Sequence, residues 1–212
     1  MIDNDLRKYI RECIFPCYER NDEGHNLNHI KYVIERSLKF AHTIPNIDYN
    51  MVYTIASYHD VGHFIDAKNH EKVSAKILLD DINLKNFFNE EQINIMADAV
   101  YDHRASMEGE PRTIYGKIVS SADRNTSIIA LMKRTYAYRL NHNPEYTLDE
   151  IIEESRKHIL DKFGNNGYAI KKMYFKDDDY DKMIKEINIL ANDKDLFKQK
   201  FIEINEIKIK NK

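Results

Sequence analysis

The sequence predicts an all-α fold, and three observations support this. The 212 residues include only six glycines and four prolines, so few positions interrupt a helix. Apolar residues recur every three or four positions instead of at alternate positions, which is the spacing of helices that bury one face. With 42% hydrophobic residues and a formal net charge of -3, the chain can bury an ample core. We expect a single domain over residues 1–212.

Five helices are expected in the first half of the chain. Each shows an apolar stripe at helical spacing, and polar turns, a proline or capping residues separate them. They cover about residues 5–19, 27–41, 49–59, 69–81 and 89–103. Asn89 and Gln92 form a variant of the capping box that opens the fifth helix. In the third helix, His59 falls on the apolar stripe, which places it at the inner end of a core helix.

Three helical segments are expected in the second half. A loop that contains Gly109 and Pro111 interrupts the pattern, and a long helix then runs from about 114 to about 140. A capping box at residues 147–150 opens another helix. Residues 177–212 are amphipathic and rich in lysine and glutamate, which indicates a helical end of the chain.

Composition argues against two kinds of partner. A sequence pI near 6.3 gives no reason to expect a surface that binds nucleic acid. No run approaches the roughly 18 apolar residues of a membrane span, and no signal segment opens the chain, so we expect a cytoplasmic protein without membrane attachment. Cys13 and Cys17 lack the Cys-x-x-Cys spacing of redox and zinc sites, and we expect both side chains to be buried.

Residues of metal-ligand type recur through the predicted helices. His59 and Asp60 are adjacent, and His29 lies upstream of them. Downstream follow His70, His103 and Asp123, each in its own apolar-periodic segment. Imidazole and carboxylate together suit Mn²⁺, Fe²⁺, Zn²⁺ or Ni²⁺. One His-Asp pair is common by chance, whereas the ordered series indicates a metal centre.

The series resembles the HD superfamily of metal-dependent phosphohydrolases, from about His25 to about Asn125. The stretch from His25 to His29 looks like that family's first-ligand motif, and residues 57–63 look like its namesake motif. Residues 117–124 look like the helix of its last ligand. The resemblance implies an HD-domain helical bundle, with a core over about 20–140 and a helical C-terminal extension over about 141–212.

The resemblance also implies a ligand set. Carried over by position, one metal ion is held by His29, His59, Asp60 and Asp123, and Asp60 can bridge to a second ion. In the cyclic-dinucleotide phosphodiesterase branch, two further histidines hold that second ion, and these match the last two candidates, His70 and His103. The cofactor would be one or two divalent ions of Mn, Fe, Ni, Zn, Co or Mg. The branch's Gly-Tyr-Pro signature is absent, so we infer no cyclic dinucleotide substrate.

The implied reaction is attack of a metal-bound hydroxide on phosphorus. We expect Asp60, His63 and Arg104 to be catalytic, with His63 contacting phosphate or protonating a leaving oxygen. Three other cations beside the motifs could hold phosphate oxygens, or could be ordinary surface charges; they are Lys68, Arg112 and Arg124. His25 is expected to be a hydrogen-bonding neighbour of the ligands and not a ligand itself.

Three functions remain open at the level of sequence. The leading one is a divalent-metal-dependent phosphohydrolase acting on a nucleotide or another small phosphate ester. The second is an HD-type di-iron oxygenase, since some relatives with the six-ligand set activate oxygen. The third is a regulatory module that binds a phosphate or nucleotide, which the intact ligand series disfavours. The partner would be a small phosphorylated substrate, and a homodimer is compatible with the sequence.

Overall fold

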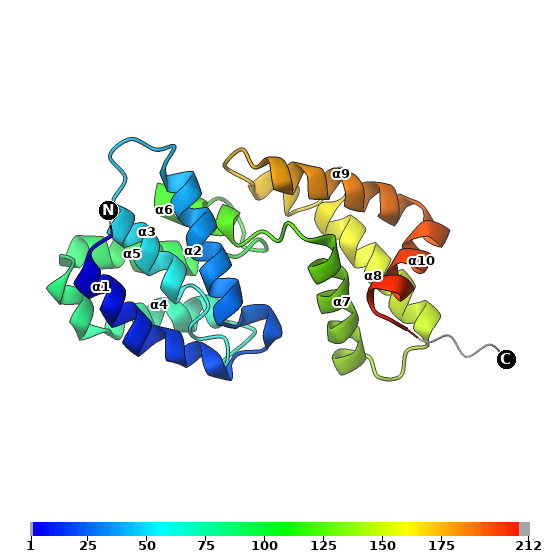
Figure 1. The fold of residues 1–212 in the computed structure, drawn as a ribbon, viewed down its shortest axis with the longest axis horizontal. Coiled ribbons are helices and arrows are strands. Elements are labelled where there is room, and N and C mark those ends of the chain that lie inside the picture. The colour runs from blue at the N-terminus through cyan, green and yellow to red at the C-terminus, as the bar shows by residue number, and fades with distance from the viewer. Residues whose placement is uncertain (1, 208–212) are drawn as a thin grey trace. The chain divides into compact units, whose positions relative to one another are not determined.

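The computed structural model describes residues 2–207, and this part of the chain contains helices and no strand (Figure 1). The prediction of an all-α fold is therefore confirmed. The chain divides into two compact units at the peptide bond between Asp123 and Arg124. Residues 124–140 lie in the second unit. The boundary between core and extension that we expect near residue 140 stays a prediction. The expectation of a single domain stays a prediction.

The first unit begins with a helical stretch whose geometry changes along its length. After α1 (Asn4–Tyr9) come a π-helical turn (Ile10–Ile14) and a 3₁₀ segment (Phe15–Arg20), which together cover the first predicted helix. A short 3₁₀ turn follows at Glu23–His25. The remaining helices of the unit are α2 (Leu27–Ala41), α3 (Tyr49–Tyr58), α4 (His70–Asp80), η4 (Ile82–Asn86), α5 (Glu90–Tyr101) and α6 (Ile114–Ala122).

Helix α3 lies at the centre of this unit. It packs against α2, α4, α5 and α6, and every residue from Met51 to Tyr58 is buried. The hydroxyl groups of Thr54 and Ser57 donate to carbonyl oxygens four residues earlier, Thr54 to Asn50 at 2.8 Å and Ser57 to Tyr53 at 2.7 Å. Residues 51–58 are thus buried on every face, with the hydroxyls of Thr54 and Ser57 satisfied, and the C-terminal end of the helix carries His59 and Asp60 into the core.

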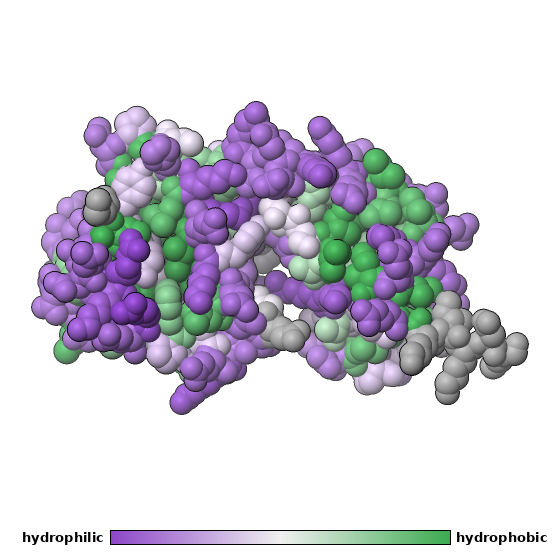
Figure 2. Space-filling view, viewed as in Figure 1, coloured by the Kyte–Doolittle hydropathy of each residue, from purple (hydrophilic) through white to green (hydrophobic). Residues whose placement is uncertain are grey.

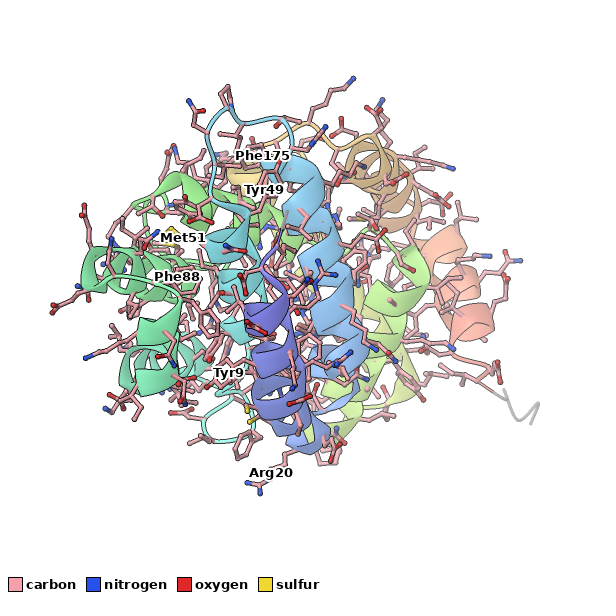
Figure 3. All side chains as sticks on the ribbon, turned by 60° about the vertical axis from the view of Figure 1, so that its left-hand side comes forward. Tyr9, Arg20, Tyr49, Met51, Phe88 and Phe175 are labelled. Atoms are coloured by element: carbon pink, nitrogen blue, oxygen red, sulfur yellow. The ribbon has the colours of Figure 1, made fainter. Side chains whose placement is uncertain are left out.

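A tyrosine cluster ties α1 to the segment between α4 and η4. The hydroxyl groups of Tyr9, which Figure 3 labels, and of Tyr58 both donate to Oδ2 of Asp81 at 2.5 Å. Tyr18 donates to the carbonyl oxygen of Ser57 at 2.7 Å, close to the end of α3. These bonds fix the N-terminal helical stretch against the helix that carries the His-Asp pair.

The predicted long helix at 114–140 is wrong. Helix α6 ends at Ala122, and α7 begins at Ile128. Polar side chains between them form caps: Asn125 Oδ1 accepts the backbone N–H of Ser127 at 2.7 Å, and the hydroxyl of Ser127 accepts that of Ala130 at 3.2 Å. Such side chains compete with the helical hydrogen bonds, so the apolar period alone overestimated the length of this helix.

The second unit packs four helices around its own apolar core. These are α7 (Ile128–His142), α8 (Leu148–Phe163), α9 (Asp178–Asn192) and α10 (Lys194–Ile204), with a 3₁₀ turn at Ile170–Lys172. The capping box of Thr147 and Glu150 at the start of α8 is confirmed. The helical end expected over 177–212 contains two helices among its described residues, because Asp193 begins α10 by accepting two backbone N–H groups. Residues 208–212 of that prediction lie outside the described residues.

Two expectations concern the surface: that the chain has no membrane span and that both cysteines are buried. Hydrophilic side chains cover most of the face drawn in Figure 2, with hydrophobic ones in smaller patches. No helix among residues 2–207 combines the length and apolar character that a membrane crossing requires. The expectation that both cysteines are buried is wrong, since Cys13 is exposed and Cys17 is only partly buried.

The tyrosine cluster makes the free energy of unfolding fall at alkaline pH. Burial, followed by the hydrogen bond to Asp81, raises the pKa of Tyr9 to about 12. A tyrosine whose folded pKa lies above its unfolded value of about 10 stabilises the fold below pH 10 and loses this contribution as the pH rises to about 12. We expect the free energy of unfolding, measured by urea denaturation, to fall across this range, and to fall less steeply in Tyr9→Phe. Tyr101→Phe, an exposed control, should match the parent.

Candidate metal centre

Six side chains of ligand type converge inside the first unit, and all of them lie at helix ends. His29 lies in the first turn of α2 and His70 begins α4. His59 follows the last residue of α3, and Asp123 follows the last residue of α6. The side chains form two groups whose ligand atoms lie within 4.8 Å of one another: His29, His59 and Asp123 in one, and Asp60, His70 and His103 in the other. The structure thus brings together all six residues that the sequence indicated.

The carboxylate of Asp60 joins the two groups. Its Oδ2 lies 3.5 Å from Nε2 of His29 and 3.3 Å from Nε2 of His59. Its Oδ1 lies 3.3 Å from Nε2 of His70 and 3.4 Å from Nε2 of His103. Each oxygen of one carboxylate therefore faces a different pair of imidazoles, which is the arrangement of a ligand that bridges two cations.

The surroundings of the buried Oδ1 of Asp60 indicate whether a cation fits between the ligand-type side chains. The Asp60 side chain is only 3% exposed, and its Oδ1 has no hydrogen-bond partner among the described residues. A buried carboxylate oxygen without a donor is costly, whereas a divalent cation between it and two imidazole nitrogens would satisfy all three atoms. The same set of nitrogen and oxygen donors suits divalent transition metals.

Within each group the imidazole nitrogens point at a common place. Nε2 of His29 lies 3.4 Å from Nε2 of His59 and 3.2 Å from Oδ1 of Asp123. In the second group, Nε2 of His70 lies 3.2 Å from Nε2 of His103. Bonds of about 2.0 to 2.2 Å from one ion to each of these atoms are compatible with such separations.

Three of the histidines are oriented by the backbone in the same way. Nδ1 lies within hydrogen-bond distance of the carbonyl oxygen three residues earlier, at 2.9 Å in His59, 3.0 Å in His70 and 2.6 Å in His103. A carbonyl oxygen can only accept, so Nδ1 carries a proton, and in the neutral ring Nε2 offers the lone pair that a metal needs. The hydrogen bond also holds the ring plane in place.

The two carboxylates stay ionised and draw a proton onto His29. Burial opposes ionisation of Asp60, but the charge of His59 and hydrogen bonds from neighbouring histidines hold its pKa well below the usual range. Burial likewise opposes ionisation of Asp123, and its hydrogen bond with His29 outweighs this and lowers the pKa. For His29, burial favours the neutral form, but hydrogen bonds to Asp123 and Asp60 raise the pKa to about 9. In His70, by contrast, burial lowers the pKa.

Two of the predicted catalytic residues lie beside this centre. The ring of His63 stacks on that of His25, with centroids 3.6 Å apart and an interplanar angle of 20°, and its centroid lies 5.3 Å from that of His70. Arg104 follows His103, and its Nη1 donates to the carbonyl oxygen of Lys68 at 2.8 Å.

The guanidinium of Arg104 also contacts a carboxylate that sequence reasoning did not single out. Nη1 donates to Glu71 Oε2 at 3.0 Å, and the side chain remains 33% exposed. Glu71 directly follows the predicted ligand His70, and this adjacency was the available signal. Lys68 itself is exposed.

The other two predicted phosphate contacts have different surroundings. Arg112 donates twice to the buried carboxylate of Asp102, from Nε and from Nη2 at 2.9 Å each, and its Nη1 lies 2.7 Å from Asp98. These bonds fasten the loop after α5 to the end of that helix, just before His103. Arg124, next to Asp123, is buried. The roles of both cations in substrate binding stay predictions.

We expect ligand substitutions to remove metal ions in a graded way. Asp60→Ala should bind neither ion, because each pair of imidazoles loses its shared carboxylate oxygen. His70→Ala combined with His103→Ala should keep the ion at His29, His59 and Asp123 and lose the other, which the parent also binds more weakly because it has fewer carboxylate ligands. Metal content after dialysis, measured by mass spectrometry, tests this, with His142→Ala in the second unit as the control. Parental metal content in Asp60→Ala would contradict the assignment.

Metal binding should release protons. At neutral pH the metal-free protein holds a proton on His29, whose pKa is about 9, and the ring must lose it to bind a cation. Affinity should therefore increase with pH and level off above about 9. Calorimetry in two buffers of different ionisation enthalpy gives the number of protons released, which should decline as the pH passes about 9. A proton count that stays constant across this range would contradict the role of His29.

The part of the chain that holds this centre matches a known protein family. The family model described as HD domain matches residues 26–127, which contain all six ligand-type residues. A solved structure of a predicted HD superfamily hydrolase from an uncultured Thermotogales bacterium is 18% identical, covers 74% of this chain and 86% of that chain, and aligns with a TM-score of 0.48. No curated protein matches the chain. By this family match, residues 26–127 form an HD domain.

Proposed function

We propose that this protein is a divalent-metal-dependent phosphohydrolase that acts on a nucleotide or another small phosphate ester. The observation that carries the proposal is the buried Asp60 carboxylate, whose two oxygens face two separate pairs of imidazoles at 3.3 to 3.5 Å. A shared carboxylate holds two cations close enough to act on one phosphoryl group.

The proposed ligand sets use the chain's own residues as follows. One cation would be held by His29, His59, Asp123 and Asp60. The other would be held by His70, His103 and Asp60. Bound divalent cations lower the pKa of a coordinated water and neutralise the charge of phosphoryl oxygens. The three backbone-bonded histidines keep their Nε2 atoms aimed inward, so the sites need little rearrangement before binding.

Cationic and histidine side chains beside the ligands are proposed to bind the substrate. Arg104 has five N–H donors, and the two bonds described above involve only Nη1, which leaves donors for phosphate oxygens. The guanidinium of Arg104 contacts the backbone carbonyl oxygen of Lys68, whose own side chain is exposed. His63, next to His70, is proposed to contact the phosphate. Together these groups favour an anionic substrate of small size.

The purified protein should hydrolyse phosphate esters only with divalent metal present. Prolonged dialysis against a chelator should reduce turnover of a phosphatase panel, including nucleotides, to background, and added Mn²⁺, Ni²⁺ or Mg²⁺ should restore it. His142→Ala should behave as the parent, because His142 lies in the second unit, where its Nδ1 lies within hydrogen-bond distance of the carbonyl oxygen of Tyr138. Full activity after metal removal would overturn the proposal. Metal-dependent oxygen consumption without phosphate release would favour the di-iron oxygenase.

A further inference from the structure

Helix α5 ends in a buried carboxylate next to a ligand-type histidine. Asp102 follows the last residue of α5, its side chain is only 2% exposed, and His103 comes directly after it. Oδ1 of Asp102 accepts from Nη2 of Arg112 at 2.9 Å, and Oδ2 accepts from Nε and from the backbone N–H of the same residue, at 2.9 Å each. A buried carboxylate is costly without such donors, so this end of α5 depends on Arg112.

The backbone beside Arg112 is fixed by the start of α6. The next residue, Thr113, caps α6 by accepting the backbone N–H of Gly116 at 3.1 Å. The preceding residue, Pro111, is buried, and a Cβ atom on Gly116 would lie 2.9 Å from its Cβ and 3.5 Å from Cα of Ala99 in α5. The missing side chain at Gly116 therefore allows α6, the loop and α5 to pack closely at this point. Arg112 thus joins the start of α6 to the end of α5.

The end of α5 sets the direction of the His103 ring. Nδ1 of His103 lies 2.6 Å from the carbonyl oxygen of Val100, in the last turn of the helix. Its Nε2 lies 3.2 Å from Nε2 of His70 and 3.4 Å from Oδ1 of Asp60. A shift of this turn would move Nε2 away from the other atoms of its ligand group. Asp123, which belongs to the first group, lies at the opposite end of α6 and does not depend on this turn.

The guanidinium of Arg112 is poorly suited to hold a phosphate. Nε and Nη2 donate to Asp102, Nη2 also donates to the carbonyl oxygen of Asp98 at 3.4 Å, and Nη1 lies 2.7 Å from the Asp98 carboxylate. Two carboxylates already balance its single positive charge. Its donors are directed at the last turn of α5, whereas Arg104 contacts one carboxylate through Nη1.

We propose that Arg112 is a positioning residue for the second cation, and that it acts through Asp102 to hold the His103 ring in the direction in which the ring binds that ion. This inference rests on the two-cation centre of the proposed function. Loss of a hydrogen-bonding partner behind a metal ligand typically costs about 10- to 100-fold in metal affinity. The Arg112 side chain is 51% exposed, so water can replace part of its bonds, and we expect the lower end of this range.

Titration of the metal-free protein with Mn²⁺, followed by calorimetry, tests the proposal. The parent should show two binding events, and His70→Ala should lose the second, which identifies it. Arg112→Met keeps most of the side-chain volume but no donors; it should weaken the second event about tenfold and change the first by less than about twofold. Arg112→Lys restores the charge without the paired donors, so its affinity should lie between those of Arg112→Met and the parent.

Two further variants make the test specific. Asp102→Asn removes the charge from the other side of the pair and should weaken the same event, which also serves if Arg112→Met folds poorly. Arg156→Met is the matched control, because Arg156 donates in the same paired way to Glu153, at 2.9 and 2.8 Å, in the second unit. It should leave both events unchanged.

Activity measurements separate positioning from contact with the substrate. For a phosphate ester that the parent hydrolyses, Arg112→Met should turn over more slowly at limiting Mn²⁺ and should approach the kcat and KM of the parent at saturating Mn²⁺. A raised KM with both Mn²⁺ affinities unchanged would make Arg112 a phosphate contact and overturn the proposal. Equal weakening of both events would indicate a general loss of structure and overturn it as well.

Failures of the parent are distinct from failures of the variant. A parent with a single Mn²⁺ binding event would remove the second cation, and this inference with it. A parent that binds two ions but hydrolyses no member of the phosphatase panel would overturn the proposed function, while calorimetry on the variants would still decide the role of Arg112.

Discussion

The first unit depends on one buried negative charge. The Asp60 carboxylate is 3% exposed and has four imidazoles around it. Burying an unpaired carboxylate costs several kcal/mol, so this position is tolerable only where positive charge or donors surround it. Each surrounding histidine comes from a different helix or helix end, and α3 must be buried on all sides to bring Asp60 among them. The packing of the helices and the charge balance of the centre therefore depend on each other.

Helix ends contribute to the charge balance of the centre in two ways. His59, His103 and Asp123 lie at or just beyond the C-terminal ends of α3, α5 and α6, where the aligned peptide dipoles leave partial negative charge. Three such ends directed at one place favour a cation there. The N-terminal end of α4 carries partial positive charge, which favours a neutral imidazole at His70, in the same direction as the effect of burial on its pKa. Backbone and side chains thus act together.

The sequence predicted those features that depend on local pattern. The bounds of α2 were predicted to the residue, because the Asn26 cap and the apolar stripe coincide there. The ligand-type residues could be picked out by their order along the chain. The break between α6 and α7 was missed, because an apolar period does not register the competing caps at Asn125 and Ser127. The pairing of Arg112 with Asp102 was missed for another reason: the two residues lie on either side of a loop, and their side chains meet only in the folded chain.

The carbonyl oxygens that orient His59, His70 and His103 belong to Ala56, Ala67 and Val100. A peptide carbonyl is present whatever side chain its residue carries, so no single replacement at these three positions deletes the acceptor itself. The hydrogen bonds that orient the rings are thus protected from point mutation but sensitive to changes in chain length. Inserting or deleting one residue between a histidine and its acceptor would shift the spacing of three and turn the ring away. The residue types at these three positions can therefore vary within the limits of packing, whereas the number of residues between each position and its histidine cannot.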